Sequence, residues 1–342
     1  MSTRFRVVLG ILVLVSFMAA CQLPRSPQTS PTGTSPASPA ASLTPFQPLT
    51  GAAATTLPPA APTRTGTPTL GATLQATPAL TQVPAPAQAL AQPAGQVNVL
   101  FLGTDQHASP GYYTYIVLLV TLRPDGSLSL TSIPANLYVL LPGQRMDRLG
   151  EAMGLGGFAL VQAAFAYNFG FAPDEYLLTD FGGYQAIIDA LGGIDVQVAQ
   201  DFQAPRPGFE PGYRVPAGMV PMDGATALWY VRSLPDGDAT AQQRRSQEVL
   251  VAMGRKLLSL QALSHGQQIY DLLRSQVDTS LGLEQALQFL PGLLNVTPQR
   301  VNRFLIGPDQ TVPWVVPDSQ TGVLLPQPDA VRLVFQQAIG TP

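Results

Sequence analysis

One acidic residue stands where the chain could do chemistry. The apolar run 97–102 ends in a Gly-Thr-Asp turn, which puts the Asp105 carboxylate at the carboxyl end of an expected buried strand. Ligands of open α/β sheets collect at that end of the strands, so Asp105 is a candidate site residue, although an aspartate that caps a turn fits the position equally well. His107 and His265 lie far apart without metal-ligand spacing, and neither is assigned a metal or catalytic role.

The amino-terminus carries a second chemical signal. Residues 1–6 include two arginines, residues 7–20 form an almost wholly apolar run, and Cys21 follows small residues. A run of this length falls short of the roughly 20 residues that a helix needs to cross a bilayer. We therefore predict that residues 1–20 are a lipoprotein signal peptide and that Cys21 becomes the lipidated end of an extracytoplasmic protein held at a bacterial membrane. An uncleaved anchor that happens to contain a cysteine is the alternative.

Composition divides the rest of the chain into a tether and one domain. Residues 22–95 hold 15 of the 34 prolines and no Asp or Glu, so the segment 21–95 is predicted to be a disordered, partly polyproline II tether. Residues 96–342 are enough for one α/β domain with a well-buried core. Cys21 is the only cysteine, which excludes a disulfide scaffold.

Charge excludes one class of partner. The net charge is −3, and residues 96–342 carry 14 basic against 21 acidic residues with Lys256 as the single lysine. Non-specific affinity for phosphate backbones comes from clustered Lys and Arg. We therefore expect no binding to nucleic acid.

Hydrophobic periodicity predicts alternating strands and helices in this domain. Strands are expected at 97–102, 114–122, 127–133 and 194–198, the second and third joined by an Arg-Pro-Asp-Gly turn, and helices at 158–169, 183–191, 240–263, 282–293 and 329–339. Thr240 with Gln243 resembles a capping box for the longest helix, whose core stripe would be Leu250, Met253 and Leu257. These elements indicate a layered sandwich of helices on a mixed sheet.

The order of five motifs resembles that of the LytR-CpsA-Psr family across essentially all of residues 96–342. The motifs are the Val-Leu-Phe-Leu-Gly-Thr-Asp run at 99–105, Leu-Thr-Ser-Ile-Pro at 130–134, the segments 180–184 and 189–196 around Asp-Ala-Leu-Gly-Gly, the run 222–233 that ends in Val-Arg-Ser, and Arg-Ser-Gln-Glu-Val-Leu at 245–250. Each motif alone is ordinary, but five in this order are specific.

The resemblance implies an α/β/α sandwich with an apolar pocket between sheet and helices that takes a polyprenyl chain. Arginines and Mg²⁺ would hold the pyrophosphate of that lipid at the pocket mouth. Family members transfer a glycopolymer, of the teichoic-acid or capsule kind, from the polyprenyl pyrophosphate to peptidoglycan or in some cases to protein. The family is also described as a transcriptional attenuator, a role that an exported acidic domain makes improbable.

The resemblance also assigns site residues. Asp105 matches the first carboxylate on Mg²⁺, while Tyr115 stands where a second one is expected. The Ser-Ile-Pro-Arg-Asp element has lost both charges here and ends at Asn136, and the Arg-Ser-Arg element keeps only Arg232. Tyr115 and Asn136 are assigned to substrate binding and Arg232 to the phosphate, as an arginine at a strand end. For Arg232, a surface pairing with Asp236 or Asp238 is the alternative.

The start of the long helix supplies the remaining assignments. Asp238 and either Arg244 or Arg245 match the family's Asp and second arginine, while the first arginine falls on Ala241 or Gln242. Gln247 is added as a substrate-binding residue. A solvated helix-end charge is an equal alternative for Arg245. For the segment 147–152, which resembles a family motif, we expect structural salt bridges.

These losses leave the reaction open. The first hypothesis is a lipid-anchored enzyme that attaches a cell-envelope glycopolymer to peptidoglycan. The second is a degenerate member that binds a polyprenyl lipid or a wall partner without turnover, and a third is a wall-associated module that binds no lipid.

Overall fold

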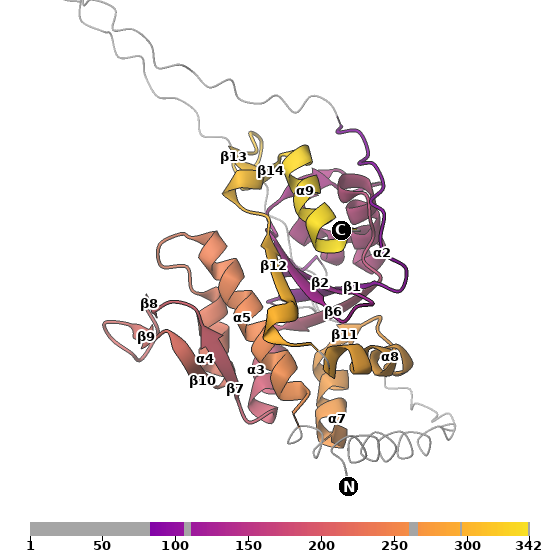
Figure 1. Cartoon of the computed structure of the whole chain (residues 1–342). Coiled ribbons are helices and arrows are strands. Elements are labelled where there is room, and N and C mark those ends of the chain that lie inside the picture. Colours follow the sequence, from indigo (N-terminus) through magenta and orange to yellow (C-terminus); the bar gives the residue numbers. More distant parts are fainter. Residues whose placement is uncertain (1–82, 106–110, 260–265, 295, 341–342) are drawn as a thin grey trace, which may run out of the picture. The chain divides into compact units, whose positions relative to one another are not determined.

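The computed structural model describes residues 83–105, 111–259, 266–294 and 296–340; the predicted signal peptide, Cys21, both histidines and most of the expected tether lie outside these ranges. A six-stranded mixed sheet forms the centre, with the strand order β11-β6-β1-β2-β3-β12 (Figure 1). Neighbours β1, β2 and β3 are antiparallel, whereas β6 is parallel to β1 and β12 is parallel to β3. The strands are β1 (Val97–Thr104), β2 (Thr114–Leu122), β3 (Leu128–Ile133), β6 (Glu175–Asp180), β11 (Asp278–Thr279) and β12 (Val301–Leu305).

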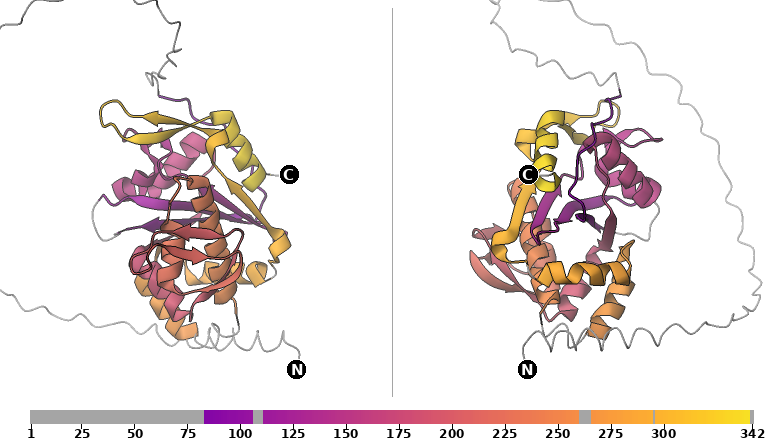
Figure 2. Two further views of the ribbon diagram at one scale, coloured as in Figure 1. Left: turned by 90° about the vertical axis from the view of Figure 1, so that its left-hand side faces the viewer. Right: turned by 45° about the vertical axis from the view of Figure 1, so that its right-hand side comes forward.

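Helices cover both faces of this sheet (Figure 2). On one face, α2 and α9 pack over Leu100 and Leu119 of the sheet, with Phe165 and Phe335 fully buried between the layers. On the other face lie α3, α4, α5 and α7. The helices are α2 (Ala152–Phe169), α3 (Phe181–Ala190), α4 (Gly224–Arg232), α5 (Ala239–Leu257), α7 (Gly266–Gln276), α8 (Leu283–Leu294) and α9 (Pro328–Ile339). The predicted layered α/β/α sandwich with a mixed sheet is confirmed.

Four two-stranded ribbons surround the central sheet. They pair β4 (Tyr138–Leu140) with β5 (Met146–Arg148), β7 (Ile194–Val198) with β10 (Gly218–Met222), β8 (Phe202–Ala204) with β9 (Tyr213–Val215), and β13 (Thr311–Val315) with β14 (Gly322–Pro326). The predicted hairpin of β2 and β3 is present, and its turn closes through Gly126 at a φ of 77°. The predicted strand over 194–198 is also present, whereas α7 was not predicted.

Helix α2 begins six residues before its predicted start. The pattern appeared to begin at residue 158 because Gly156 and Gly157 interrupt the helix with non-helical backbone angles. The first turn of α2 directly follows the 3₁₀ turn Leu149–Glu151. The combined segment Leu149–Phe169 is apolar and long enough to cross a membrane by composition alone, yet Phe165 and its neighbours belong to the buried core.

Helix α5 begins at a different cap from the predicted one. The Asp238 side chain accepts a hydrogen bond of 3.0 Å from the Ala241 amide, so the predicted capping box of Thr240 and Gln243 is wrong. An aspartate side chain can accept from the unpaired amides of a first helical turn as well as a threonine can. Asp238 directly precedes the helix, whereas Thr240 already lies within it. The helix ends at Leu257, and residues 260–263 of the prediction lie outside the described ranges.

The last part of the predicted tether is packed against the domain. Within residues 83–95, the Ala87 and Leu90 amides donate to backbone carbonyls at the end of α2 and just after it, over 2.7 and 2.8 Å. Leu90 is 8% exposed and joins the core. We call residues 83–95 the strap. The domain therefore begins about a dozen residues earlier than predicted, and these residues depart from the expected tether.

Candidate functional site

Two cavities adjoin each other on the sheet face that α3 and α5 cover. The first, of about 140 Å³, is the apolar cavity; it lies between the sheet and α3, α5 and α7. Its wall includes Phe101, Ile116, Leu118, Leu177, Leu178, Ile187, Leu250, Met253, Leu257, Leu273 and Val277. The predicted stripe of α5 therefore lines a cavity with half-buried side chains, while Val249 and Ala252 are the α5 residues in the closed core.

The second cavity, of about 440 Å³, is the polar pocket. Its polar wall residues are Tyr113, Tyr115, Ser132, Asn136, Arg232, Gln242, Gln243 and Ser246. Ile116, Leu118, Val231 and Ser246 line both cavities, so the two are neighbours. An apolar chain in the first cavity would thus place a polar head in the second, which is the arrangement that an amphiphilic ligand needs.

Arg232 enters the polar pocket from the end of a helix. It is the last residue of α4, so its predicted place at a strand end is wrong. Helix α4 packs closely on α3 at Gly224. A Cβ at this position would lie only 2.4 Å from the Gln185 carbonyl oxygen, so a larger residue would not fit. This packing brings the Arg232 guanidinium to 4.1 Å from the centre of the Phe181 ring at the start of α3. A stacked guanidinium keeps its edge N–H groups available to an anion.

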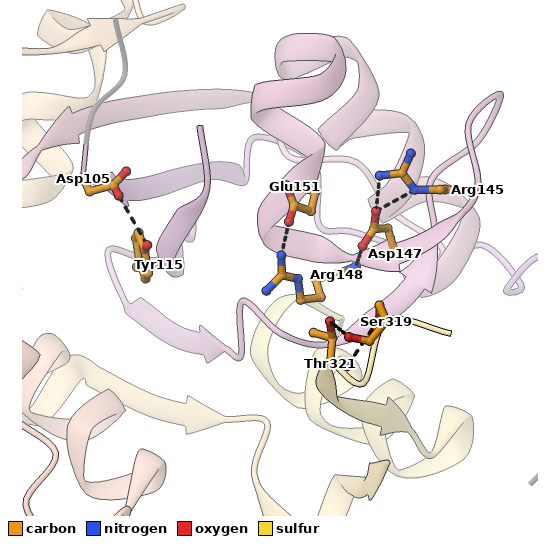
Figure 3. A network of polar contacts seen from close by, with 8 residues as sticks. All are labelled: Asp105, Tyr115, Arg145, Asp147, Arg148, Glu151, Ser319 and Thr321. Atoms are coloured by element: carbon orange, nitrogen blue, oxygen red, sulfur yellow. Dashed lines mark hydrogen bonds and ion pairs between the residues drawn. The ribbon is translucent and has the colours of Figure 1, made fainter. Parts of the chain in front are cut away.

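Asp105 and Tyr115 lie side by side, as Figure 3 shows, and Tyr115 lines the polar pocket. The register of β1 and β2 shifts after Gly103, and Thr104 pairs with Thr114, which sets the end of one strand beside the start of the other. The Tyr115 hydroxyl donates a hydrogen bond of 3.3 Å to Asp105 Oδ2. Burial and the neighbouring Asp105 carboxylate raise the pKa of Tyr115, so the phenol stays protonated at neutral pH.

A second arginine lies near the pocket but is charge-compensated. Arg148 forms an ion pair with Glu151, and its guanidinium stacks 4.5 Å from the centre of the Tyr113 ring (Figure 3). Asp147 pairs in turn with Arg145. The prediction of structural salt bridges in the segment 147–152 is therefore confirmed.

The remaining predicted residues do not all meet at the pocket. Asn136 lines it, from the loop after β3. The buried Gln247 amide instead donates to Phe304 O over 2.8 Å and to Ser132 Oγ over 2.9 Å, which ties α5 to the sheet. Asp238 caps α5.

Arg244 and Arg245 lie on another side of α5. Arg245 is 7% exposed, and its guanidinium donates to the Tyr230 carbonyl over 2.8 Å and to the Ser233 carbonyl. Burial lowers the pKa of Arg245. Both arginines line a separate pocket of about 270 Å³ with Asp238 and Glu248, and the solvated alternative for Arg245 does not match its burial.

Sequence reasoning missed several pocket residues. Gln242, Gln243 and Ser246 share one face of α5, and Phe181 supplies the ring under Arg232. Gln242 and Gln243 lie four and three residues before Ser246, and this spacing indicates that the three side chains share a helix face. The motif resemblance instead assigned the neighbouring arginines, Arg244 and Arg245, to the site.

The donor set does not fit a magnesium site made by the protein. Mg²⁺ prefers an octahedron of oxygen ligands with carboxylates among them. Within the described ranges, no cluster of three or more His, Cys, Asp or Glu side chains could hold a metal ion. Asp105 has a phenol as its neighbour, and Asp180 caps α3 by accepting from the Gly183 amide. The Mg²⁺ site predicted from the sequence is untested, and the described donor set argues against it in the wild type.

The mixed sheet with helices on both faces defines an α/β domain with two neighbouring cavities, and sequence comparison places it in a family. The LytR_cpsA_psr family matches residues 71–315, so the chain belongs to that family. The family assignment made from the sequence is confirmed.

Named relatives cover about half of the chain. A protein of Oceanobacillus iheyensis named polyisoprenyl-teichoic acid–peptidoglycan teichoic acid transferase TagU is 28% identical over 199 residues, which span 55% of this chain and 60% of the relative. The regulatory protein MsrR of Staphylococcus aureus is 24% identical over 192 residues, spanning 55% and 57%. The matches thus cover less than two thirds of the relatives' own length.

Solved structures share the fold. The crystal structure of B. subtilis TagV has a TM-score of 0.60 at 21% identity and covers 72% of this chain and 98% of that one. The structure of TagT bound to LI-WTA has a TM-score of 0.56 at 19% identity and covers 72% and 91%.

Proposed function

We propose that this protein takes the polyprenyl carrier of a cell-envelope glycopolymer in its paired cavities and transfers the polymer to peptidoglycan. The observation that carries the proposal is the apolar cavity sharing a wall with a polar pocket that contains Arg232. Relatives named as polyisoprenyl-teichoic acid–peptidoglycan transferases support the same substrate class. The partners would be the lipid-linked polymer and peptidoglycan.

The proposed site divides the ligand between two environments. The prenyl chain would replace water against Phe101, Leu250 and Met253, which is favourable because apolar area leaves water. The phosphate would accept hydrogen bonds from the edge of the Arg232 guanidinium. The sugar hydroxyls would form hydrogen bonds with Asn136 and with the side-chain amides of Gln242 and Gln243. These residues bind and orient the lipid.

Location follows from the amino-terminus. We propose that residues 1–20 are removed as a signal peptide and that a lipid on Cys21 holds the domain outside the bacterial membrane. Residues 21–82 would then form the tether, because the strap is packed on the domain.

A second candidate is a protein that holds a polyprenyl lipid without transferring its polymer. One observation favours it: Arg244 and Arg245 do not line the polar pocket, so the described pocket wall contains fewer cations than a phosphoryl-transfer site uses.

The test separates transfer from binding. The full chain, a lipid-linked teichoic acid precursor and peptidoglycan would be incubated, and polymer attached to the wall would be measured. Transfer that falls at least tenfold in Arg232→Gln supports the enzyme. Lipid binding without transfer supports the second candidate, and failure to bind the lipid contradicts both.

A further inference from the structure

The pocket that Arg244 and Arg245 line is separated from the polar pocket by one short segment of chain. The Gln242 amide, in the wall of the polar pocket, donates to the Arg232 carbonyl over 3.1 Å. Arg245 donates to the next carbonyl along the chain, that of Ser233, from the other pocket. We call this second cavity, of about 270 Å³, the charged pocket. The two pockets therefore flank the same residues after α4.

Two opposite charges are buried in the wall of the charged pocket, and no ion pair joins them. Arg245 is 7% exposed and Glu248 is 5% exposed. The guanidinium donates to the carbonyls of Tyr230 and Ser233. The Glu248 carboxylate accepts from the Tyr230 hydroxyl over 2.8 Å and from the Ala199 amide over 3.3 Å. A buried charge that is bonded only to neutral groups costs free energy, and a ligand of opposite charge offsets that cost.

The buried guanidinium keeps one nitrogen for such a ligand. Nε and Nη2 of Arg245 are used by the two carbonyls, whereas Nη1 donates to no described residue. Burial lowers the pKa of Arg245, because the charged form loses its hydration, and the charges of Glu248 and Asp238 offset this only in part. A carboxylate bound at Nη1 would stabilise the charged guanidinium further.

The rim of the pocket repeats this combination of charges. Arg244 and Asp236 line the pocket and are exposed, and their side chains form no hydrogen bond or ion pair with any described residue. The other two acids of the wall are engaged, because Asp238 caps α5 and Asp201 pairs with Arg214. The wall thus offers a ligand two cations and two carboxylates that lack a partner of opposite charge among the described residues.

We infer that the charged pocket binds a zwitterionic end group of a peptide, in which an ammonium and a carboxylate lie close together. The carboxylate would bind Arg244 and Arg245, and the ammonium would bind Asp236 and Glu248. The source of the group rests on the proposed function, because the peptide of a peptidoglycan acceptor carries such charges. Since both pockets flank the residues after α4, a wall peptide held in the charged pocket would bring its glycan toward the polar pocket.

The test is a calorimetric titration of the full chain in detergent with N-acetylmuramoyl tripeptide ending in meso-diaminopimelate, which carries a free ammonium and a carboxylate on one carbon. Two analogues each remove one charge, by acetylation of that amine or by amidation of that carboxylate. We expect each analogue to bind about tenfold more weakly than the parent peptide, the size of one charge-assisted contact.

Two variants should separate the charges. Asp236→Asn should reduce the discrimination against the acetylated analogue several-fold and leave that against the amidated analogue unchanged, and Arg244→Gln should do the reverse. Asp318→Asn and Arg255→Gln change exposed residues outside the pocket and should affect neither. A residue with only a structural role would not produce this crossed pattern.

The outcomes distinguish this site from the proposed function. Equal binding of the parent and both analogues, or no binding of the parent, would overturn the inference, and polymer transfer from the lipid would then still support the proposed function. Free meso-diaminopimelate that binds as tightly as the muramoyl peptide would overturn the assignment to a wall peptide. The crossed pattern in a protein that neither binds the lipid nor transfers its polymer would support the site and contradict the proposed function.

Discussion

The Tyr115 hydroxyl donates to the Asp105 carboxylate over 3.3 Å, and so a phenol occupies the space next to the acid that ends β1. Tyr115 is 52% exposed and packs its ring against Tyr113 and Phe181, with centroid distances of 5.0 and 6.0 Å. The phenol thus belongs to a row of rings that leads from Arg148 to Arg232.

Exchanging that phenol for an acid should create a metal site. Tyr115→Asp places two carboxylates side by side, and Mg²⁺ binds such oxygen pairs while relieving their repulsion. We expect saturable Mg²⁺ binding in the millimolar range for Tyr115→Asp by calorimetry, and none for the wild type or for Tyr115→Asn. Saturable binding by the wild type would show that the present residues already hold the ion.

Much of the fold followed from the sequence because its signals were local. The apolar run of β1, the Arg-Pro-Asp-Gly turn and the glycines after α3 each predict an element on their own. The site was harder, since it depends on which side of a helix faces the sheet. Arg245 and Gln242 are three residues apart on α5, yet the arginine packs under Phe202 and the glutamine lines the pocket. The motif resemblance assigned the arginines to the site, and it could not predict which side of α5 faces the pocket.

Gln247 should matter for stability rather than for ligand binding. Its amide donates to Phe304 O and Ser132 Oγ, and Gln247→Leu would leave these buried acceptors without that donor. We expect a loss of about 1–3 kcal/mol in the free energy of unfolding, measured with urea. The exposed Gln267→Leu on α7 is the control and should change stability by less than about 0.5 kcal/mol. An unchanged midpoint for Gln247→Leu would contradict the assigned contacts.

The strap can be tested at the glycine that lies against it. A Cβ on Gly170 would meet the Gln88 carbonyl at 2.1 Å, and Gly170 has a φ of 81°. Gly157 has a φ of 64° with no atom within 4 Å of its Cβ position, so Gly157→Ala isolates the backbone cost. Gly157→Ala should lose about 1–3 kcal/mol from its backbone angles alone. Gly170→Ala should lose about 1–2 kcal/mol from its left-handed angles and, in addition, the cost of displacing Gln88. Only Gly170→Ala should expose residues 83–95 to limited proteolysis; equal cleavage in both variants would argue against a packed strap.

Stability should fall at alkaline pH as buried phenols ionise. Burial raises the pKa of Tyr113 from 10.0 to about 12. The folded state keeps this proton where the unfolded state has lost it, so the contribution is complete below pH 10 and disappears as the pH rises toward 12. Tyr113→Phe should therefore reduce the fall in unfolding free energy between these pH values by about 1–2 kcal/mol, measured by urea titration at each pH. A parallel pH profile for the variant would refute this.

Cys21 provides the test of location. In the producing bacterium, the wild type should sediment with membranes and resist washing with salt, because lipid chains insert into the bilayer. Cys21→Ser should lose the lipid and the processing that depends on it, which mass spectrometry of the amino-terminal peptide would show. Identical processing of both proteins would favour an uncleaved anchor.

We propose that a prenyl chain occupies the apolar cavity with its phosphate at Arg232. The most direct measurement is photo-crosslinking of the full chain with a prenyl phosphate that carries a diazirine on its chain, followed by peptide mapping. We expect labels on β2 and α5, at residues such as Ile116, Leu250 and Met253, and we expect unlabelled farnesyl monophosphate to abolish this labelling by competition. Labels scattered over the surface, or labels that resist competition, would contradict it.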